Sequence, residues 1–209
     1  KLLEKNSNSK LYTYECDISN RTTVKNTIDK ITKEIGKINL AILNAAAYSP
    51  NKEQEFSIEN YEYLIDVNLK GTLYCLEFLI EKMKYSNDHI AIVSSPVGYR
   101  GLPTAGAYGL TKAGLINLSE SLFFDLKKYK IKISIINPGF IKTESTKLNS
   151  FPMPFLKTSE YAANKIFKSL TGKYKFEIYF PWIFLIIMKI LRILPYKIYF
   201  YLISKVTRL

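Results

Sequence analysis

The chain has 209 residues, which is enough for one sizeable hydrophobic core, and no segment has the composition of a linker between two independent domains. Its two cysteines, Cys16 and Cys75, stand in no metal-ligand spacing, which argues against disulfide-rich and zinc-stabilised classes. We therefore expect no metal site and a cytoplasmic location. The formal net charge of +12 leaves nucleic acid, anionic lipid and a phosphorylated cofactor as alternative partners.

The position of the positive charge narrows these alternatives. Residues 173–209 contain seven lysines and arginines but only one acidic residue, Glu177, so this end of the chain holds half of the net charge. The same residues are the most apolar part of the sequence. Because the chain has no nucleic-acid recognition motif and its charge lies beside apolar residues, we expect no nucleic-acid partner.

Hydrophobic periodicity predicts strands that alternate with helices. In chain order, the pattern predicts a strand at 11–19, a helix at 21–35, a strand at 39–47, a helix at 58–84, a strand at 89–95, a helix at 107–129, a strand at 132–140, a helix at 159–170 and a short strand at 176–180. Near-continuous apolar strands separated by helices are typical of a parallel sheet covered on both faces. We expect an α/β fold of the Rossmann-like, doubly wound type.

A parallel sheet of this kind binds its ligands beyond the carboxyl ends of the strands. Four consecutive predicted strands end in polar or small residues, which are Asp17, then 44–46, then Ser94 and Ser95, then 137–143. Chemistry is therefore expected at this edge of the sheet.

The stretch YGLTK places Tyr108 and Lys112 four positions apart, on one face of a predicted helix. An ammonium group beside a phenol stabilises the phenolate and lowers the phenol's pKa, which suits a group that donates and regains a proton at neutral pH. By itself the pattern carries little weight, because 16 tyrosines make such a spacing common on an ordinary helix surface. The one histidine, His89, begins a strand and is interpreted as structural.

Ser95 lies thirteen residues before Tyr108, and with Lys112 these residues give the chain a pattern that resembles the classical short-chain dehydrogenase/reductase family. The resemblance extends over nearly all of residues 1–180. It implies that Tyr108 is the general acid and base, that Lys112 also holds the cofactor ribose, and that Ser95 bonds the substrate oxygen. It further implies that Asn68 holds a water that passes protons to Lys112.

The resemblance also implies an NAD(P) cofactor and residues that contact it besides Tyr108 and Lys112. These residues are Asp17, Ile18, Asn44, Ala45, Ala46, Pro138, Gly139 and Thr143. Leu43 and Ala46 replace the first asparagine and the glycine of the family's N-N-A-G segment, and neither change removes a reacting group. Simpler interpretations stay open, since Asp17 could cap the next helix and a Pro-Gly pair forms a turn in any fold.

One family feature is missing from the sequence. The family binds its dinucleotide through a T-G-x-x-x-G-x-G turn, and this chain has no such turn. The resemblance places the missing strand-helix-strand unit before Lys1, so we interpret the chain as a fragment that binds cofactor poorly and folds less stably alone. Without that unit, the strand at 11–19 would be separated from the sheet. The basic composition slightly favours NADP over NAD.

Residues 181–209 form a basic, apolar extension to the 1–180 domain. The longest uncharged run there, from 178 to 188, is well short of the roughly 20 residues that span a bilayer. A helix after Pro195 would be basic and amphipathic, which is typical of a segment lying at a membrane surface. We expect residues 182–209 to contact the inner face of a membrane; the alternative is that they cover an apolar groove or a partner subunit.

The leading functional hypothesis is an NAD(P)-dependent oxidoreductase acting on a small alcohol or carbonyl compound. The apolar extension suggests a lipophilic substrate, and the family resemblance suggests a homo-oligomer. The alternative is a catalytically idle relative that binds lipid or a protein partner at a membrane surface. The presence of Ser95, Tyr108 and Lys112 together argues against an idle protein.

Overall fold

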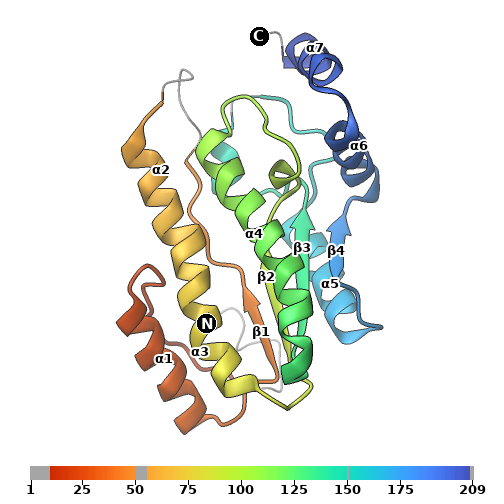
Figure 1. The fold of residues 1–209 in the computed structure, drawn as a ribbon. Coiled ribbons are helices and arrows are strands. Elements are labelled where there is room, and N and C mark those ends of the chain that lie inside the picture. Colours follow the sequence, from red (N-terminus) through yellow and green to blue (C-terminus); the bar gives the residue numbers. More distant parts are fainter. Residues whose placement is uncertain (1–9, 50–55, 150, 208–209) are drawn as a thin grey trace.

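The computed structural model describes residues 10–49, 56–149 and 151–207. Within them the sheet has four parallel strands, in the spatial order β1-β2-β3-β4 (Figure 1). The strands are β1 (Leu40–Leu43), β2 (His89–Val93), β3 (Lys132–Pro138) and β4 (Glu177–Phe180). The predicted Rossmann-like α/β fold is confirmed.

Helices follow each strand and several begin at a side-chain cap. Asn20, Ser57 and Thr158 each accept a hydrogen bond from a backbone N–H of the first turn that follows. The helices are α1 (Arg21–Glu34), α2 (Ile58–Leu64), α3 (Gly71–Met83), α4 (Gly106–Asp125), α5 (Ser159–Thr171), α6 (Trp182–Ile193) and α7 (Tyr196–Thr207). A π-helical segment, Ile65–Lys70, joins α2 to α3, so the predicted helix at 58–84 is continuous.

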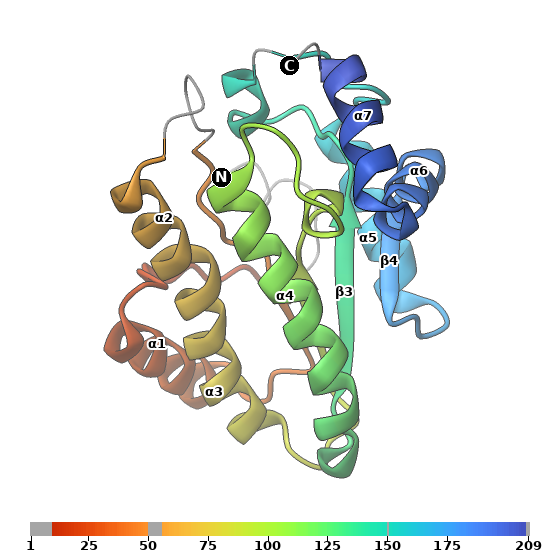
Figure 2. The ribbon, with the colours of Figure 1, turned by 45° about the horizontal axis from the view of Figure 1, so that its top comes forward.

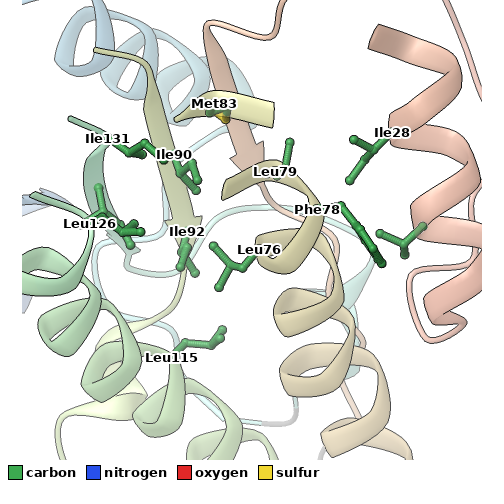
Figure 3. Packing of buried hydrophobic residues seen from close by; sticks show 12 residues of the cluster. Ile28, Leu76, Phe78, Leu79, Met83, Ile90, Ile92, Leu115, Leu126 and Ile131 are labelled. Carbon is green, nitrogen blue, oxygen red and sulfur yellow. The ribbon is translucent and has the colours of Figure 1, made fainter. Parts of the chain in front are cut away.

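The main core lies between the sheet and the layer formed by α1, α3 and α4. Figure 3 shows side chains from all three helices and from β2 meeting there, among them Ile28, Leu76, Leu115 and Ile92, which are all buried. Each such side chain contributes roughly 1.5–3 kcal/mol on burial. In Figure 2, α3 and α4 lie in front of the strands and α5 behind them.

The opposite face of the sheet is covered by α5, over β3 and β4. Ala91, Ala162 and Ile178 form the buried cluster on this side. On the edge strand β1, Leu40 and Ile42 are 41% and 44% exposed. Ile42 pairs with Ala91, which places it on the α5 face, beyond the reach of that helix.

The predicted strand at 11–19 is wrong. Residues 10–17 form no strand, and a turn at Ile18 and Ser19 leads into α1. A strand exists only if a neighbour accepts and donates its backbone hydrogen bonds, and no strand of the described sheet lies beside this segment. Cys16 and Ile18 instead pack against the main core through their side chains.

The last two helices differ in how they meet the domain. Leu185 and Met188 of α6 are buried in a cluster with Tyr99 and Ile135, whereas α7 buries Tyr199 alone among its described residues. None of the helices described here combines the length and the apolar character needed to cross a bilayer.

The junction between β2 and α4 is unusually close. The Ser94 hydroxyl donates to the carbonyl oxygen of Lys112 at 2.9 Å, and Gly98 lies against the same backbone. A Cβ placed on Gly98 would be 2.7 Å from the carbonyl carbon and oxygen of Lys112. Only glycine permits this approach.

We predict that Gly98→Ala lowers the free energy of unfolding by roughly 1–3 kcal/mol, because the added methyl group meets rigid helix backbone. Urea unfolding would measure the loss. Gly101→Ala is the matched control, because a Cβ there meets nothing within 4 Å and should change stability little. Equal effects at the two positions would contradict this account of the junction.

Candidate active site

Tyr108 and Lys112 lie on the first turns of α4, on the side that faces the carboxyl end of β2. The Lys112 Nζ atom is 5.4 Å from the centroid of the Tyr108 ring. It donates a hydrogen bond of 2.9 Å to the carbonyl oxygen of Val93, the last residue of β2. The structure therefore brings the phenol and the amine together, with the strand end holding the amine in place.

The amino group of Lys112 is deeply buried, with the residue only 2% exposed. Burial lowers the pKa of Lys112 to about 8, because a buried ammonium loses its hydration. Val93 is its one hydrogen-bond partner among the described residues. Since an ammonium has three N–H bonds, two remain for a ligand with hydroxyl groups.

The ring of Tyr108 lies against that of Tyr48 in an edge-to-face contact, with centroids 4.9 Å apart. Burial raises the pKa of Tyr108, and the nearby Tyr48 phenol raises it further. The causes of this shift are desolvation and Tyr48, while the Lys112 Nζ atom donates to Val93. The expected lowering of the phenol pKa by Lys112 stays a prediction.

Ser95 follows β2 and caps the short 3₁₀ helix Pro96–Gly98, where its hydroxyl accepts from the N–H of Val97 at 3.4 Å. It forms no hydrogen bond to Tyr108 or Lys112 in the described structure. Ser95 is connected to Lys112 only indirectly, because its neighbour Ser94 and nearby Gly98 both contact the backbone of Lys112. Ser95 thus lies at the junction that packs against the backbone of Lys112.

Asn68 lies in the π-helical segment and is 1% exposed. Its carboxamide accepts from the N–H of Ala47 at 2.7 Å and donates to the carbonyl of Ala47 at 3.0 Å and to the Thr111 hydroxyl at 3.2 Å. Asn68 therefore ties the segment after β1 to α4. Helices with such π-helical irregularities often place a functional residue there.

Asp17 and Ile18 lie outside this cluster. The Asp17 carboxylate accepts hydrogen bonds from the Ser19 hydroxyl and N–H, and these bonds lower the pKa of Asp17. The cap of α1 is Asn20 rather than Asp17. Ile18 packs on Gly71 of α3, where an added Cβ would be 2.9 Å from its Cδ1 atom.

The remaining candidate cofactor contacts lie at the carboxyl ends of β1 and β3. Asn44, Ala45 and Ala46 follow β1 and are exposed. Pro138 ends β3, and Gly139 donates from its N–H to Phe180 O at 2.8 Å. The N–H of Thr143 donates to Thr146 Oγ1 at 2.9 Å, which folds this segment into a turn.

Sequence reasoning missed two parts of this region. The first part is Tyr48, whose ring contacts that of Tyr108. In the sequence, only its position just after residues 44–46 indicates that it lies near the site. The second part is a buried network in which Asn137 donates to the Tyr99 hydroxyl at 2.7 Å and to the Glu177 carboxylate at 3.1 Å, while Tyr99 also donates to Glu177. Lys189 of α6 pairs with the same carboxylate.

A profile of the short chain dehydrogenase family matches residues 1–151, which is more than half of the sequence. The chain belongs to the short-chain dehydrogenase family. Within the described residues, no cluster of three or more histidine, cysteine or acidic side chains could hold a metal ion.

Relatives within the short-chain dehydrogenase family include several oxidoreductases. An uncharacterized oxidoreductase of Myxococcus xanthus is 30% identical over 182 residues, covering 87% of this chain and 72% of the relative. An NADH-dependent L-xylulose reductase of Ambrosiozyma monospora is 30% identical over 144 residues, covering 66% of this chain and 53% of the relative. The chain thus spans about half to three-quarters of the length of these relatives.

Solved structures of short-chain dehydrogenases share the fold. One from Burkholderia cenocepacia J2315 in complex with NADP matches with a TM-score of 0.71 and 22% sequence identity, covering 80% of this chain and 70% of that structure. This likeness supports the Rossmann-like architecture.

We predict that Lys112→Met raises the free energy of unfolding at pH 7 by up to a few kcal/mol, because it removes a buried charge. The folded-state pKa of Lys112 is depressed to about 8 from 10.5. Between these values the unfolded chain holds a proton that the folded chain has lost, so wild-type stability rises with pH. The difference in free energy of unfolding between variant and wild type should therefore become smaller from pH 8 to pH 10.

Urea unfolding at pH 7 and pH 10 would measure this difference. Lys33→Met, on the exposed face of α1, is the matched control and should shift stability by less than about 0.5 kcal/mol at both values. A difference of the same size at both pH values would show that folding does not depress the pKa of Lys112.

Proposed function

We propose that this protein is an NAD(P)-dependent oxidoreductase that interconverts an alcohol and a carbonyl compound. One observation carries the proposal: a buried amine lies beside the ring of Tyr108, at the strand end that also bears Ser95. Family membership and relatives named as oxidoreductases support it.

Each of these side chains has a role in the proposed reaction. When bound, the nicotinamide supplies or accepts the hydride. The Tyr108 hydroxyl donates its proton to the substrate oxygen in reduction and regains it in oxidation. The Lys112 ammonium stabilises the phenolate left behind and donates its two remaining N–H bonds to ribose hydroxyls. Ser95 donates a hydrogen bond to the same substrate oxygen.

Asn68 has a positioning role in this proposal. Its carboxamide is fully engaged by Ala47 and Thr111, so it holds the segment of Tyr48 against α4 and keeps the half-buried Tyr108 covered on that side. The water that the family resemblance places at Asn68 would bond its backbone or a neighbour rather than this side chain. Covering Tyr108 matters because water around it would compete for the proton.

We propose that residues at the carboxyl ends of β1 and β3, together with two residues before α1, hold the rest of the cofactor. The proposed contacts are Asp17, Ile18, Asn44, Ala45, Ala46, Pro138, Gly139 and Thr143. The net charge of +12 slightly favours NADP, while a relative that is NADH-dependent keeps NAD as a candidate. Association of two or more copies and a cytoplasmic location remain predictions.

Tyr108→Phe should lower carbonyl-dependent NAD(P)H oxidation by roughly a hundredfold or more, because no proton reaches the forming alkoxide. Cofactor binding, measured by quenching of protein fluorescence or by calorimetry, should persist. Tyr63→Phe is the control, since Tyr63 is 56% exposed on α2 and should leave the rate unchanged. Equal, measurable rates for the Tyr108 variant and wild type would show that Tyr108 is not the proton donor, and absence of activity in the wild type would point to an idle relative.

We also propose that the substrate is lipophilic, because α6 and α7, which carry exposed apolar side chains, lie near the carboxyl ends of β3 and β4 (Figure 1). Across a series of methyl ketones, kcat/KM should rise about fourfold for each added methylene that is buried, which corresponds to about 0.8 kcal/mol. Steady-state assays along the series would measure this. A flat dependence on chain length would contradict a lipophilic substrate while leaving the reaction type intact.

A further inference from the structure

Helix α6 is apolar on both of its faces. Leu185 and Met188 point into the core, yet the outward side carries Trp182, Ile186 and Ile190, which are 62%, 45% and 51% exposed. These outward residues are spaced four apart and so form one stripe along the helix. A soluble surface helix normally has polar residues on this side, which indicates that something apolar covers it.

Helix α7 continues the exposed apolar surface and adds positive charge. Phe200 is 60% exposed and Val206 is 79% exposed, while Lys197 and Lys205 are exposed and form no ion pair among the described residues. Between residues 178 and 207 the sequence has no aspartate or glutamate. The covering partner must therefore be apolar and carry negative charge.

We infer that the outward stripe of α6 and the exposed side of α7, together called the α6–α7 surface, dock into the interface of an anionic lipid bilayer. Apolar side chains beside lysines, with no acidic residues between them, are the pattern of an interfacial membrane helix. Trp182, Tyr196 and Tyr201 are exposed on the same helices, and such aromatic residues favour the headgroup region. A protein interface, by contrast, is depleted of lysine.

Specific contacts hold the α6–α7 surface against the rest of the domain. The Arg100 guanidinium donates to the carbonyl oxygens of Arg192 at 2.9 Å and Leu194 at 3.3 Å. These two residues lie at the C-terminal end of α6. It also lies over the rings of Tyr196 and Tyr199, at 4.5 and 4.4 Å. The buried Tyr199 hydroxyl donates to Gly101.

These contacts would set the orientation of the docked protein. Arg100 and Gly101 belong to the loop that runs from Ser95 to α4. The loop that carries the proposed catalytic serine therefore also contacts α6 and α7. Figure 2 shows α7 at the end of the molecule where the strands finish. Docking would therefore turn the carboxyl end of the sheet towards the bilayer.

Trp182, the single tryptophan of the chain, provides a direct test. With vesicles of equal parts phosphatidylglycerol and phosphatidylcholine, its fluorescence should shift to shorter wavelength and be quenched by brominated lipid. With phosphatidylcholine alone the shift should be much smaller, and added salt should reverse it because the lysines are screened. No shift with either vesicle would overturn the inference.

Matched variants separate the apolar and the charged contributions. Ile190→Gln should weaken vesicle binding on the order of tenfold, since one apolar side chain no longer enters the lipid. Phe167→Gln is the control and should leave vesicle binding unchanged, because Phe167 is 66% exposed on α5, outside the α6–α7 surface. Lys197→Gln with Lys205→Gln should weaken binding about fivefold per lysine, which is about 1 kcal/mol each. Lys33→Gln with Lys168→Gln removes the same charge elsewhere and is the control.

The outcomes distinguish a bilayer from other partners and from the proposed reaction. If Ile190→Gln abolishes a dimer in analytical ultracentrifugation but leaves vesicle binding unchanged, the α6–α7 surface covers a second copy of the chain and the inference fails. If the control variants weaken binding as much as the surface variants, attraction is non-specific and the inference also fails. Tyr108→Phe should bind vesicles like wild type, so membrane docking and catalysis are tested independently.

Discussion

The burial of the Lys112 amino group is the constraint on which the candidate site depends. An ammonium group deprived of water is costly unless a strong acceptor faces it, and the acceptor here is the carbonyl of Val93 at the end of β2. Ser94 and Gly98 hold the helix backbone of Lys112 against the same strand end. Together these contacts fix the register of α4 on the sheet, and with it the position of Tyr108.

The same region is connected to the C-terminal helices through a buried polar network. Glu177 of β4 accepts from Tyr99 and Asn137 and pairs with Lys189 of α6. Burial and this carboxylate raise the pKa of Tyr99, so it remains a proton donor in the network. The Oδ1 atom of Asn137 has no protein partner among the described residues. Because buried polar networks require specific geometry, α6 is held in one orientation on the sheet.

Much of the fold followed from local patterns. Most strands and helices from 21 onward lie close to their expected ranges, because apolar runs and helical periodicity reflect which side of each element is buried. The exception is the strand expected at 39–47, which forms only over Leu40–Leu43. The segment 11–19 has the composition of a strand, yet it forms none, since pairing depends on a neighbour that local sequence does not describe. The spacing of Tyr108 and Lys112 correctly places them on one helix face, but Tyr48 and the Val93 carbonyl come from distant parts of the chain.

The sequence by itself determined the alternation of strands and helices, the family resemblance, and the residue types at the strand ends. These properties depend on periodicity and spacing, which are local. Only the tertiary structure decided how those residues are surrounded: burial raises the pKa of Tyr108 and lowers that of Lys112, and Asn68 is engaged by Ala47 and Thr111. Desolvation and hydrogen bonding depend on every group packed nearby, and most of those groups are remote in the chain.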